Sequence, residues 1–139
     1  MERIVISFIQ NNIKLIKEIF FYGIIGLTSA GIDSGVYYLL TRKLFFNEYA
    51  ANFIGINIGI TISFLLNTYF NFQKKNNLLK RATSFYLTGY AGLGLSMLLL
   101  YLGINIMHFN DFFIKIASIF IIAVFQFTLN KSITYGKIK

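Results

Sequence analysis

Four long apolar stretches separated by polar links dominate the pattern along the chain. They cover about residues 20–40, 50–70, 85–107 and 112–129, and charged side chains are rare within them. A helix needs about 20 apolar residues to cross the hydrocarbon core of a bilayer, and each stretch is close to that length. The pattern therefore predicts an all-α membrane protein with four transmembrane helices in one domain, residues 20–139.

The first 19 residues have a different character. Val5, Phe8, Ile9 and Ile13 recur at helical spacing between charged and amide side chains. This arrangement is typical of a helix that lies on the membrane surface. The alternative is a frayed cytoplasmic tail, because the ends of a chain are often unordered. Residues 1–19 are expected to form a cytoplasmic or interfacial segment.

Lysine and arginine residues set the expected orientation. Ten of them lie in the N-terminal segment, in the 71–84 link and beyond the fourth stretch, whereas the 41–49 link has two and the 108–111 link has none. Cytoplasmic loops of membrane proteins carry the excess of basic residues. We therefore expect both termini and the 71–84 link to be cytoplasmic. The two short links pair the helices into two hairpins.

A repeated motif relates these two hairpins. The segment 64–72 at the end of the second stretch matches the segment 127–135 at the end of the fourth, with Asn67 and Asn130 at the same position of a Phe-x-x-Asn motif. Since both hairpins are expected to start on the same side, this is a parallel repeat about an axis along the membrane normal.

Composition narrows the possible chemistry. The chain has no cysteine and one histidine, which excludes disulfides, thiol catalysis and a multi-histidine metal site within one chain. No nucleophile with its base and no phosphate-binding loop is recognisable, so we expect neither an enzyme nor a cofactor. The positive-inside bias accounts for most of the net charge of +8. Nucleic-acid binding is therefore not expected.

Polar side chains within the apolar stretches are the first candidates for a site. Asp33 in the first stretch, Asn52 and Asn57 in the second and Lys115 in the fourth all fall in the outer half of the membrane. A charged group at such depth costs about 3 kcal/mol or more unless it is paired or hydrated. We expect a polar pocket that opens outward. The alternative is a purely structural Asp33–Lys115 ion pair.

Glycine pairs bear on the packing of the first two helices. Gly31 and Gly35 share one helix face, as do Gly55 and Gly59. Asp33 lies midway between the first pair, so it is expected to point away from that glycine face. We expect the glycine faces to pack closely and the polar faces to line a cavity. Glycine faces without an internal partner would favour a homo-oligomer.

The cytoplasmic rim is the second candidate site. Asn67 and Asn130 lie at helix ends, where they are expected either to hydrogen-bond nearby backbone or to contact a phosphate. Four cations near these ends would attract an anionic lipid headgroup, although they also serve orientation. These cations are Lys74, Lys75, Arg81 and Lys131.

With these features the sequence resembles the GtrA family of small bacterial membrane proteins, over about residues 20–135. The resemblance rests on the paired hairpins, the Phe-x-x-Asn endings and three short motifs. These motifs are Ile32-Asp33, Ala50-Ala51-Asn52 and Ile114-Lys115-Ile116. The family's endings usually read Asn-Arg-x-Trp-x-Phe, whereas Thr68 stands in place of the arginine and Ile133 in an aromatic position.

This resemblance implies a role in decorating cell-surface polysaccharide, such as teichoic acid, at the bacterial cytoplasmic membrane. Members are thought to move a polyprenyl-phosphate-linked sugar between leaflets or to assist the membrane glycosyltransferases that use it. Two alternatives stay open. One is a proton-coupled exporter of small cations, similar in size to the small multidrug resistance proteins. The other is a non-transporting partner subunit of a glycosyltransferase.

Overall fold

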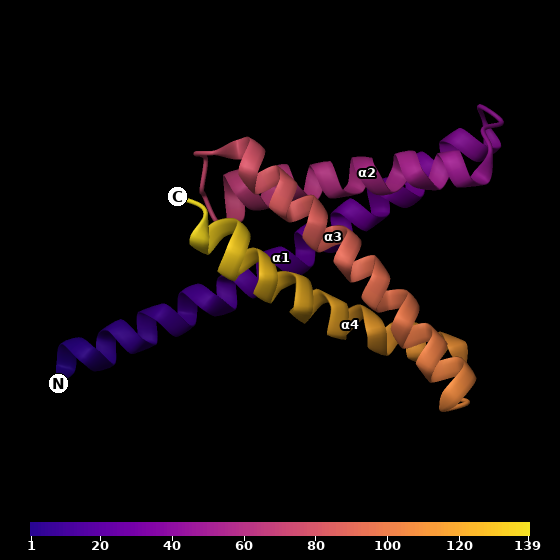
Figure 1. Cartoon of the computed structure of the whole chain (residues 1–139). Helices are drawn as coiled ribbons and strands as arrows, with labels where there is room; N and C mark the ends of the chain where they lie inside the picture. The colour runs from indigo at the N-terminus through magenta and orange to yellow at the C-terminus, as the bar shows by residue number, and fades with distance from the viewer. The chain divides into compact units, whose positions relative to one another are not determined.

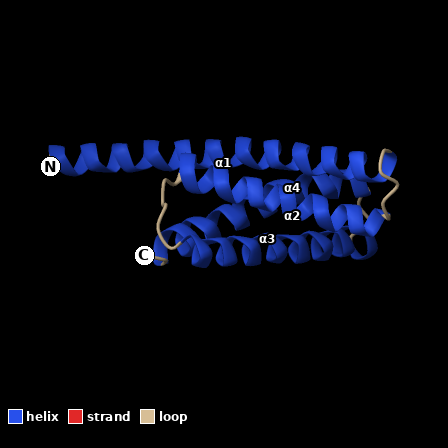
Figure 2. Cartoon of the chain, turned by 90° about the horizontal axis from the view of Figure 1, so that it is seen from above, coloured by secondary structure: helices blue, strands red, loops and turns tan.

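The computed structural model describes the backbone of residues 1–139 and most of the side chains. All regular structure in the described chain is helical, and 86% of the residues are in helices (Figure 2). The all-α prediction is therefore confirmed. The side chains outside the description are those of Glu48, Tyr49, Asn52, Ser96, Leu100, Asp111, Phe112, Lys115, Ile116 and Ile119.

Four α-helices form the chain (Figure 1). Their bounds are α1 Glu2–Arg42, α2 Glu48–Leu66, α3 Leu78–Tyr101 and α4 Asp111–Leu129. The last three each continue into a short π-helix. These π-helices are η1 Asn67–Asn71, η2 Leu102–Ile106 and η3 Asn130–Lys137. The apolar pattern predicted the number of helices but not the π-helical ends, and α3 begins seven residues before the predicted start at residue 85.

Helix α1 is a single helix of 41 residues. The segment 1–19 is helical, as predicted, and it continues into the rest of α1 without a break. At 1.5 Å per residue a helix of this length extends about 60 Å, roughly twice the thickness of the hydrocarbon core. Part of α1 is therefore expected to lie outside that core.

Three helical stretches of the described residues are long and apolar enough to cross a membrane. They are Glu2–Arg42, Phe53–Asn71 and Leu78–Ile106. Half of the side chains outside the description belong to α4. The count of four spans and the cytoplasmic position of both termini stay predictions.

The chain forms two compact units, Met1–Lys75 and Asn76–Lys139. In the first unit α1 packs on α2, and in the second unit α3 packs on α4 and η3. The two predicted hairpins are thus present, one in each unit. Many large apolar side chains are exposed, such as Leu27 and Phe120. Such exposed apolar helix surfaces suit contact with lipid chains.

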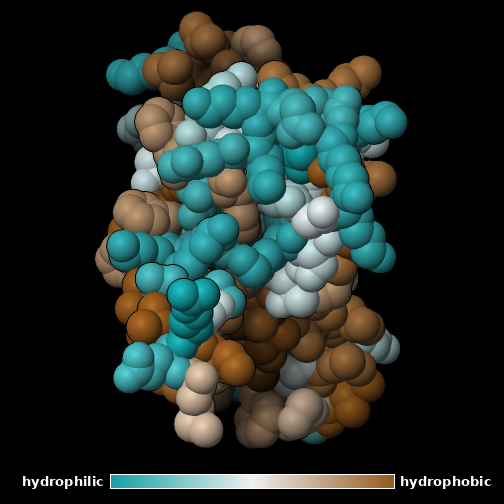
Figure 3. All heavy atoms as spheres, turned by 90° about the vertical axis from the view of Figure 1, so that its left-hand side faces the viewer, coloured by the Kyte–Doolittle hydropathy of each residue, from teal (hydrophilic) through white to brown (hydrophobic). Residues whose placement is uncertain are grey.

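Hydrophilic side chains gather in broad patches on the face seen in Figure 3.

Candidate functional site

Asp33 packs against the glycine face of α2 in the first unit. A Cβ atom at Gly55 would collide with the carboxylate oxygen Oδ1 of Asp33. A Cβ atom at Gly59 would lie 3.1 Å from Asp33 Cβ and 3.3 Å from the backbone oxygen of Ser29. The two glycines therefore allow the polar face of α1 to approach α2 closely.

This contact corrects the predicted roles of the helix faces. Gly31 and Gly35 of α1 have no atom of another element within 4 Å of a Cβ built on them. The expectation that both glycine faces pack while the polar faces line a cavity is therefore wrong for α1. The physical reason is shape, because a face that carries a carboxylate needs room and the side-chain-free surface of α2 at Gly55 and Gly59 provides it.

The polar groups of α1 at this contact lack partners among the described residues. The hydroxyl of Ser29 is buried without a hydrogen-bond partner. Asp33 has no ion pair with any described side chain, and its predicted partner Lys115 lies outside the described side chains, as does Asn52. Asn57 donates a hydrogen bond from Nδ2 to the backbone oxygen of Phe53 at 2.7 Å. The outward-opening pocket stays a prediction.

The end of the first hairpin at η1 carries a polar contact between helices. Asn71 in η1 donates from Nδ2 to the backbone oxygen of Glu18 in α1 at 3.1 Å and to Asn67 Oδ1 at 3.0 Å. Asn67 is fully buried and donates from Nδ2 to the backbone oxygen of Ser63 at 2.9 Å. This short network joins the end of α2 to α1.

The corresponding end of the second hairpin carries a matching contact. Thr134 in η3 donates to Asn130 Oδ1 at 2.9 Å, and its hydroxyl lies 2.7 Å from the hydroxyl of Ser84 in α3. Thr134 and Asn130 are both almost fully buried. This network joins the end of α4 to α3.

The two networks support the predicted repeat. In each hairpin the residue four positions after the motif asparagine bonds that asparagine and also contacts the preceding helix of the hairpin. In each hairpin these residues also lie in a π-helix. Asn67 thus donates to nearby backbone, which is the first of its two interpretations, whereas Asn130 accepts from the side chain of Thr134.

Arg81 is part of the second network rather than a solvated cation. Its side chain is 1% exposed. Nη1 donates to the backbone oxygen of Thr134 at 2.6 Å, Nε donates to the backbone oxygen of Asn76 at 2.7 Å, and Nη2 donates to Asn76 Oδ1 at 2.8 Å. The guanidinium also lies 6.0 Å from the centre of the Tyr135 ring. Arg81 fastens the start of α3 to η3.

The other predicted rim cations are more open. Lys74 and Lys75 are exposed in the first unit, and Lys75 Nζ lies 5.8 Å from the centre of the Tyr69 ring. Lys131 belongs to the second unit and is half-buried. A common entrance formed by these cations stays a prediction.

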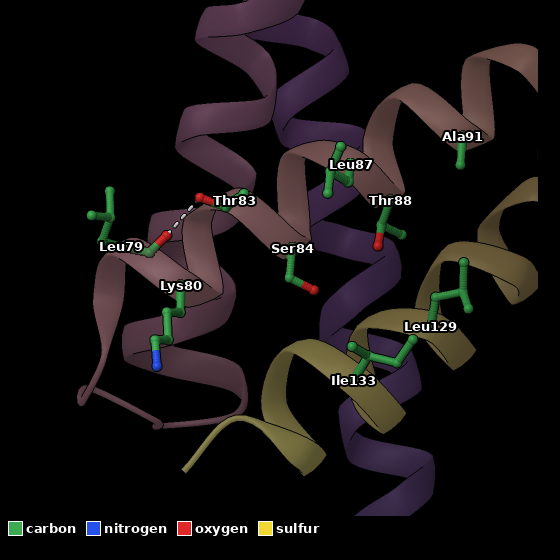
Figure 4. A pocket seen from close by; sticks show the side chains of 9 residues that line it. All are labelled: Leu79, Lys80, Thr83, Ser84, Leu87, Thr88, Ala91, Leu129 and Ile133. Carbon is green, nitrogen blue, oxygen red and sulfur yellow. Dashed lines mark hydrogen bonds between the residues drawn. The ribbon is translucent and has the colours of Figure 1, made fainter.

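A groove of about 610 Å³ runs along the second hairpin (Figure 4). One wall is formed by a face of α3 from Leu79 to Ala91, and the other by Leu129 of α4 and Ile133 of η3. Ligand sites commonly have volumes of about 300–1,000 Å³ and mostly apolar linings with a few polar groups. The groove fits that description.

The polar groups of the groove all come from α3. Lys80 lies near the start of α3 with its ammonium group exposed, and Thr83, Ser84 and Thr88 add hydroxyl groups. None of these four was a predicted site residue. Their spacing in the sequence indicates one polar face of a helix. The sequence does not show that the end of α4 packs beside this face and forms the second wall of a groove.

These features define a class: helical membrane proteins built from two related hairpins, with an apolar groove and a cation at one end of it. The chain matches the family described as GtrA/DPMS, transmembrane domain, over residues 21–135, and it belongs to that family. The predicted resemblance is confirmed. No curated protein and no solved structure matches the chain. Membership indicates involvement in the handling of polyprenyl-phosphate sugars, with a flippase-type rather than a catalytic association.

Proposed function

We propose that this protein translocates a polyprenyl-phosphate-linked sugar across the bacterial cytoplasmic membrane, for glycosylation of a cell-surface polymer such as teichoic acid. The family indicates the class of lipid. The observation that carries the proposal is the groove of the second hairpin, whose apolar walls suit an isoprenoid chain and whose hydroxyl groups suit a sugar.

Charge at the end of the groove supports an anionic substrate. Lys80 is exposed where α3 begins, and it is the cation among the residues that line the groove. A basic residue near an anionic membrane surface contributes about 1 kcal/mol of attraction. Because Arg81 already donates its hydrogen bonds within the second hairpin, Lys80 is the better candidate for contact with the phosphate.

A proton-coupled exporter of cations fits the geometry less well. Such a transporter needs a carboxylate that exchanges protons with its substrate. Asp33 instead packs directly on Gly55 and Gly59 of the neighbouring helix. The cationic end of the groove would also repel a cationic substrate.

The test is a leaflet-exchange assay in liposomes with a labelled polyprenyl-phosphate hexose. The protein is expected to accelerate exchange over protein-free liposomes. Lys80→Gln should slow exchange at low lipid concentration, because the attraction for the phosphate is lost. Lys137→Gln is the matched control, since Lys137 is also exposed near the end of the same unit but lies outside the groove lining.

The outcomes bear separately on translocation and on the role of Lys80. Exchange equal to that of protein-free liposomes would exclude translocation. If such an inactive protein also captured a membrane glycosyltransferase, the accessory-subunit alternative would replace it. If Lys80→Gln and Lys137→Gln had equal effects on exchange, Lys80 would have no specific role in substrate binding.

A further inference from the structure

Thr88 differs from every other threonine of the α-helices. A threonine in a helix usually donates its hydroxyl to the carbonyl four residues earlier, which satisfies the hydroxyl in an apolar setting. The threonines that do so are Thr28, Thr41, Thr61, Thr83 and Thr128. Thr88 makes no such bond, and no hydrogen bond of its hydroxyl is found among the described residues.

The position of Thr88 makes this free hydroxyl informative. Its side chain lines the groove and is only 7% exposed. Figure 4 shows the hydroxyl pointing from α3 towards the α4 side of the groove. An apolar groove offers such a hydroxyl few partners, and an unpaired hydroxyl in an apolar setting costs about 1–3 kcal/mol. A group that is left unpaired in this way is suited to hydrogen-bond a ligand.

The internal repeat allows the groove of the second hairpin to be compared with the equivalent positions in the first hairpin. In the first helices of the two hairpins an offset of 66 residues pairs Glu18 of one network with Ser84 of the other, and also pairs Gly23 with Gly89. With this offset Thr88 aligns with Tyr22 and Ala91 aligns with Ile25. Ile25 is buried in the first hairpin. Large side chains thus stand in the first hairpin where the second has small ones, so the groove is a property of the second hairpin.

We propose that the Thr88 hydroxyl is a hydrogen-bonding subsite for the sugar headgroup on its way across the membrane, and that Ala91 keeps this path open. The proposal rests on the proposed translocation of a polyprenyl-phosphate sugar. Lys80, Ser84 and Thr88 follow one another at four-residue spacing along one face of α3. At a rise of 1.5 Å per residue, Thr88 lies about 12 Å further along the axis than Lys80.

The chemistry of the headgroup explains why a hydroxyl is needed there. A sugar brings several hydroxyl groups that lose their water when they enter an apolar groove. Thr88 can both donate and accept, so it can replace part of that water. Ser84 is already engaged by Thr134 at 2.7 Å, and Thr83 donates to Leu79 at 3.0 Å. Thr88 is therefore the first free hydroxyl along this face of α3 beyond Lys80.

The first test measures leaflet exchange of a polyprenyl-phosphate hexose. Thr88→Val removes the hydroxyl at nearly constant shape and should slow the maximal rate roughly fivefold, the equivalent of one hydrogen bond. Half-saturation by lipid should change little, because Lys80 still recruits the phosphate. Thr88→Ser should restore the rate. Thr128→Val is the matched control and should exchange like wild type, since the Thr128 hydroxyl already bonds the backbone oxygen of Val124 and Thr128 lies outside the groove lining.

The second test does not depend on transport. The chain has no cysteine, so a single cysteine is a clean probe of water access. In proteoliposomes, Thr88→Cys should react with a charged methanethiosulfonate reagent, and a polyprenyl-phosphate hexose should slow that reaction. Tyr90→Cys, on the opposite exposed face of α3, should stay unreactive in lipid. Ala91→Ile, which copies the first hairpin, should abolish the reactivity of Thr88→Cys.

The results separate this subsite from the wider function. Exchange by wild type with an unchanged rate for Thr88→Val would overturn the subsite and leave translocation intact. No exchange by wild type, together with protection of Thr88→Cys by the lipid, would overturn translocation and keep the subsite. An unreactive Thr88→Cys, or one that the lipid does not protect, would overturn the subsite in either case.

Discussion

Arg81 shows how a single side chain can join two segments that are far apart in the sequence. Its guanidinium donates to Asn76 before α3 and to Thr134 in η3, and its side chain is almost completely buried. The planar guanidinium offers five donors in a fixed geometry, which lysine does not. Hydrogen bonds of charged groups contribute about 1.5–3 kcal/mol each when buried, more than neutral ones.

Arg81→Lys is expected to destabilise the second hairpin by about 2 kcal/mol, because lysine keeps the charge but cannot reach both acceptors. Thermal unfolding in mild detergent measures the effect. Lys80→Arg on the neighbouring exposed position is the control and should leave stability unchanged. If Arg81→Lys unfolds at the same temperature as wild type, the charge and not the hydrogen-bond geometry stabilises this end of the hairpin.

Gly55→Ala is expected to destabilise the first hairpin by about 2 kcal/mol through overpacking, since the new methyl group would collide with the Asp33 carboxylate. Gly31→Ala, where no other element lies nearby, should leave stability unchanged. Combining Gly55→Ala with Asp33→Ala should recover most of the loss. If the double variant were no more stable than Gly55→Ala alone, the carboxylate would not be the colliding group.

At the scale of elements, each hairpin ends in a π-helix that carries its polar network. The backbone amide of Phe72 bonds the oxygen of Asn67 at 2.8 Å, and the amide of Ile138 bonds the oxygen of Ile133 at 3.3 Å, both across five residues. Single π-helical turns are rare and are frequently found at functional sites. Here they lie where α2 contacts α1 and where α4 contacts α3.

The sequence predicted the helices and the paired asparagines because those depend on apolar length and on a short motif. It did not predict the π-helical ends, since the added residue per turn leaves no mark on the apolar pattern. It assigned Arg81 to headgroup recruitment because the burial of Arg81 depends on Thr134 in η3, which is 53 residues away in the chain. The groove was missed for the same reason, because Leu129 and Ile133 form its second wall.

Helix α1 leads to a further prediction. Between Arg3 and Lys17 its cations fall within about 60° of one another around the helix, at 3.6 residues per turn. Val5 and Phe8 lie on the opposite side and are exposed. A peptide of residues 1–19 should therefore become helical on vesicles with anionic lipids, and circular dichroism measures this. Lys14→Glu with Lys17→Glu should weaken binding, and a peptide that stays unordered on anionic vesicles would contradict an interfacial role.

At the scale of the whole molecule, orientation in the membrane is the property on which translocation depends. The excess of lysine and arginine in the terminal segments and the middle link predicts that these parts are cytoplasmic. The two short links of the hairpins would then lie outside. Lys80 would face the compartment where the lipid-linked sugar is made, and the groove would start from that side.

Single cysteines in the cysteine-free chain test this orientation. Ser7→Cys, Asn76→Cys and Lys139→Cys should be blocked only by a membrane-permeant thiol reagent in intact cells. Asn47→Cys and His108→Cys should be blocked by an impermeant one. All five of these positions are exposed, so access is set by the membrane and not by the fold. Labelling of Asn76→Cys from outside would contradict the predicted orientation.

The self-contained hydrogen-bond network of each hairpin has a consequence for biosynthesis. Ribosomes add about 5–20 residues per second and N-terminal units generally fold first. Glu18, Asn67 and Asn71 have all been synthesised once residue 75 is complete, so the first hairpin can close before the second one emerges. The same independence suits an origin by gene duplication and fusion. Two separately encoded halves, divided after Lys75, should then assemble into a working protein when they are produced together in one cell.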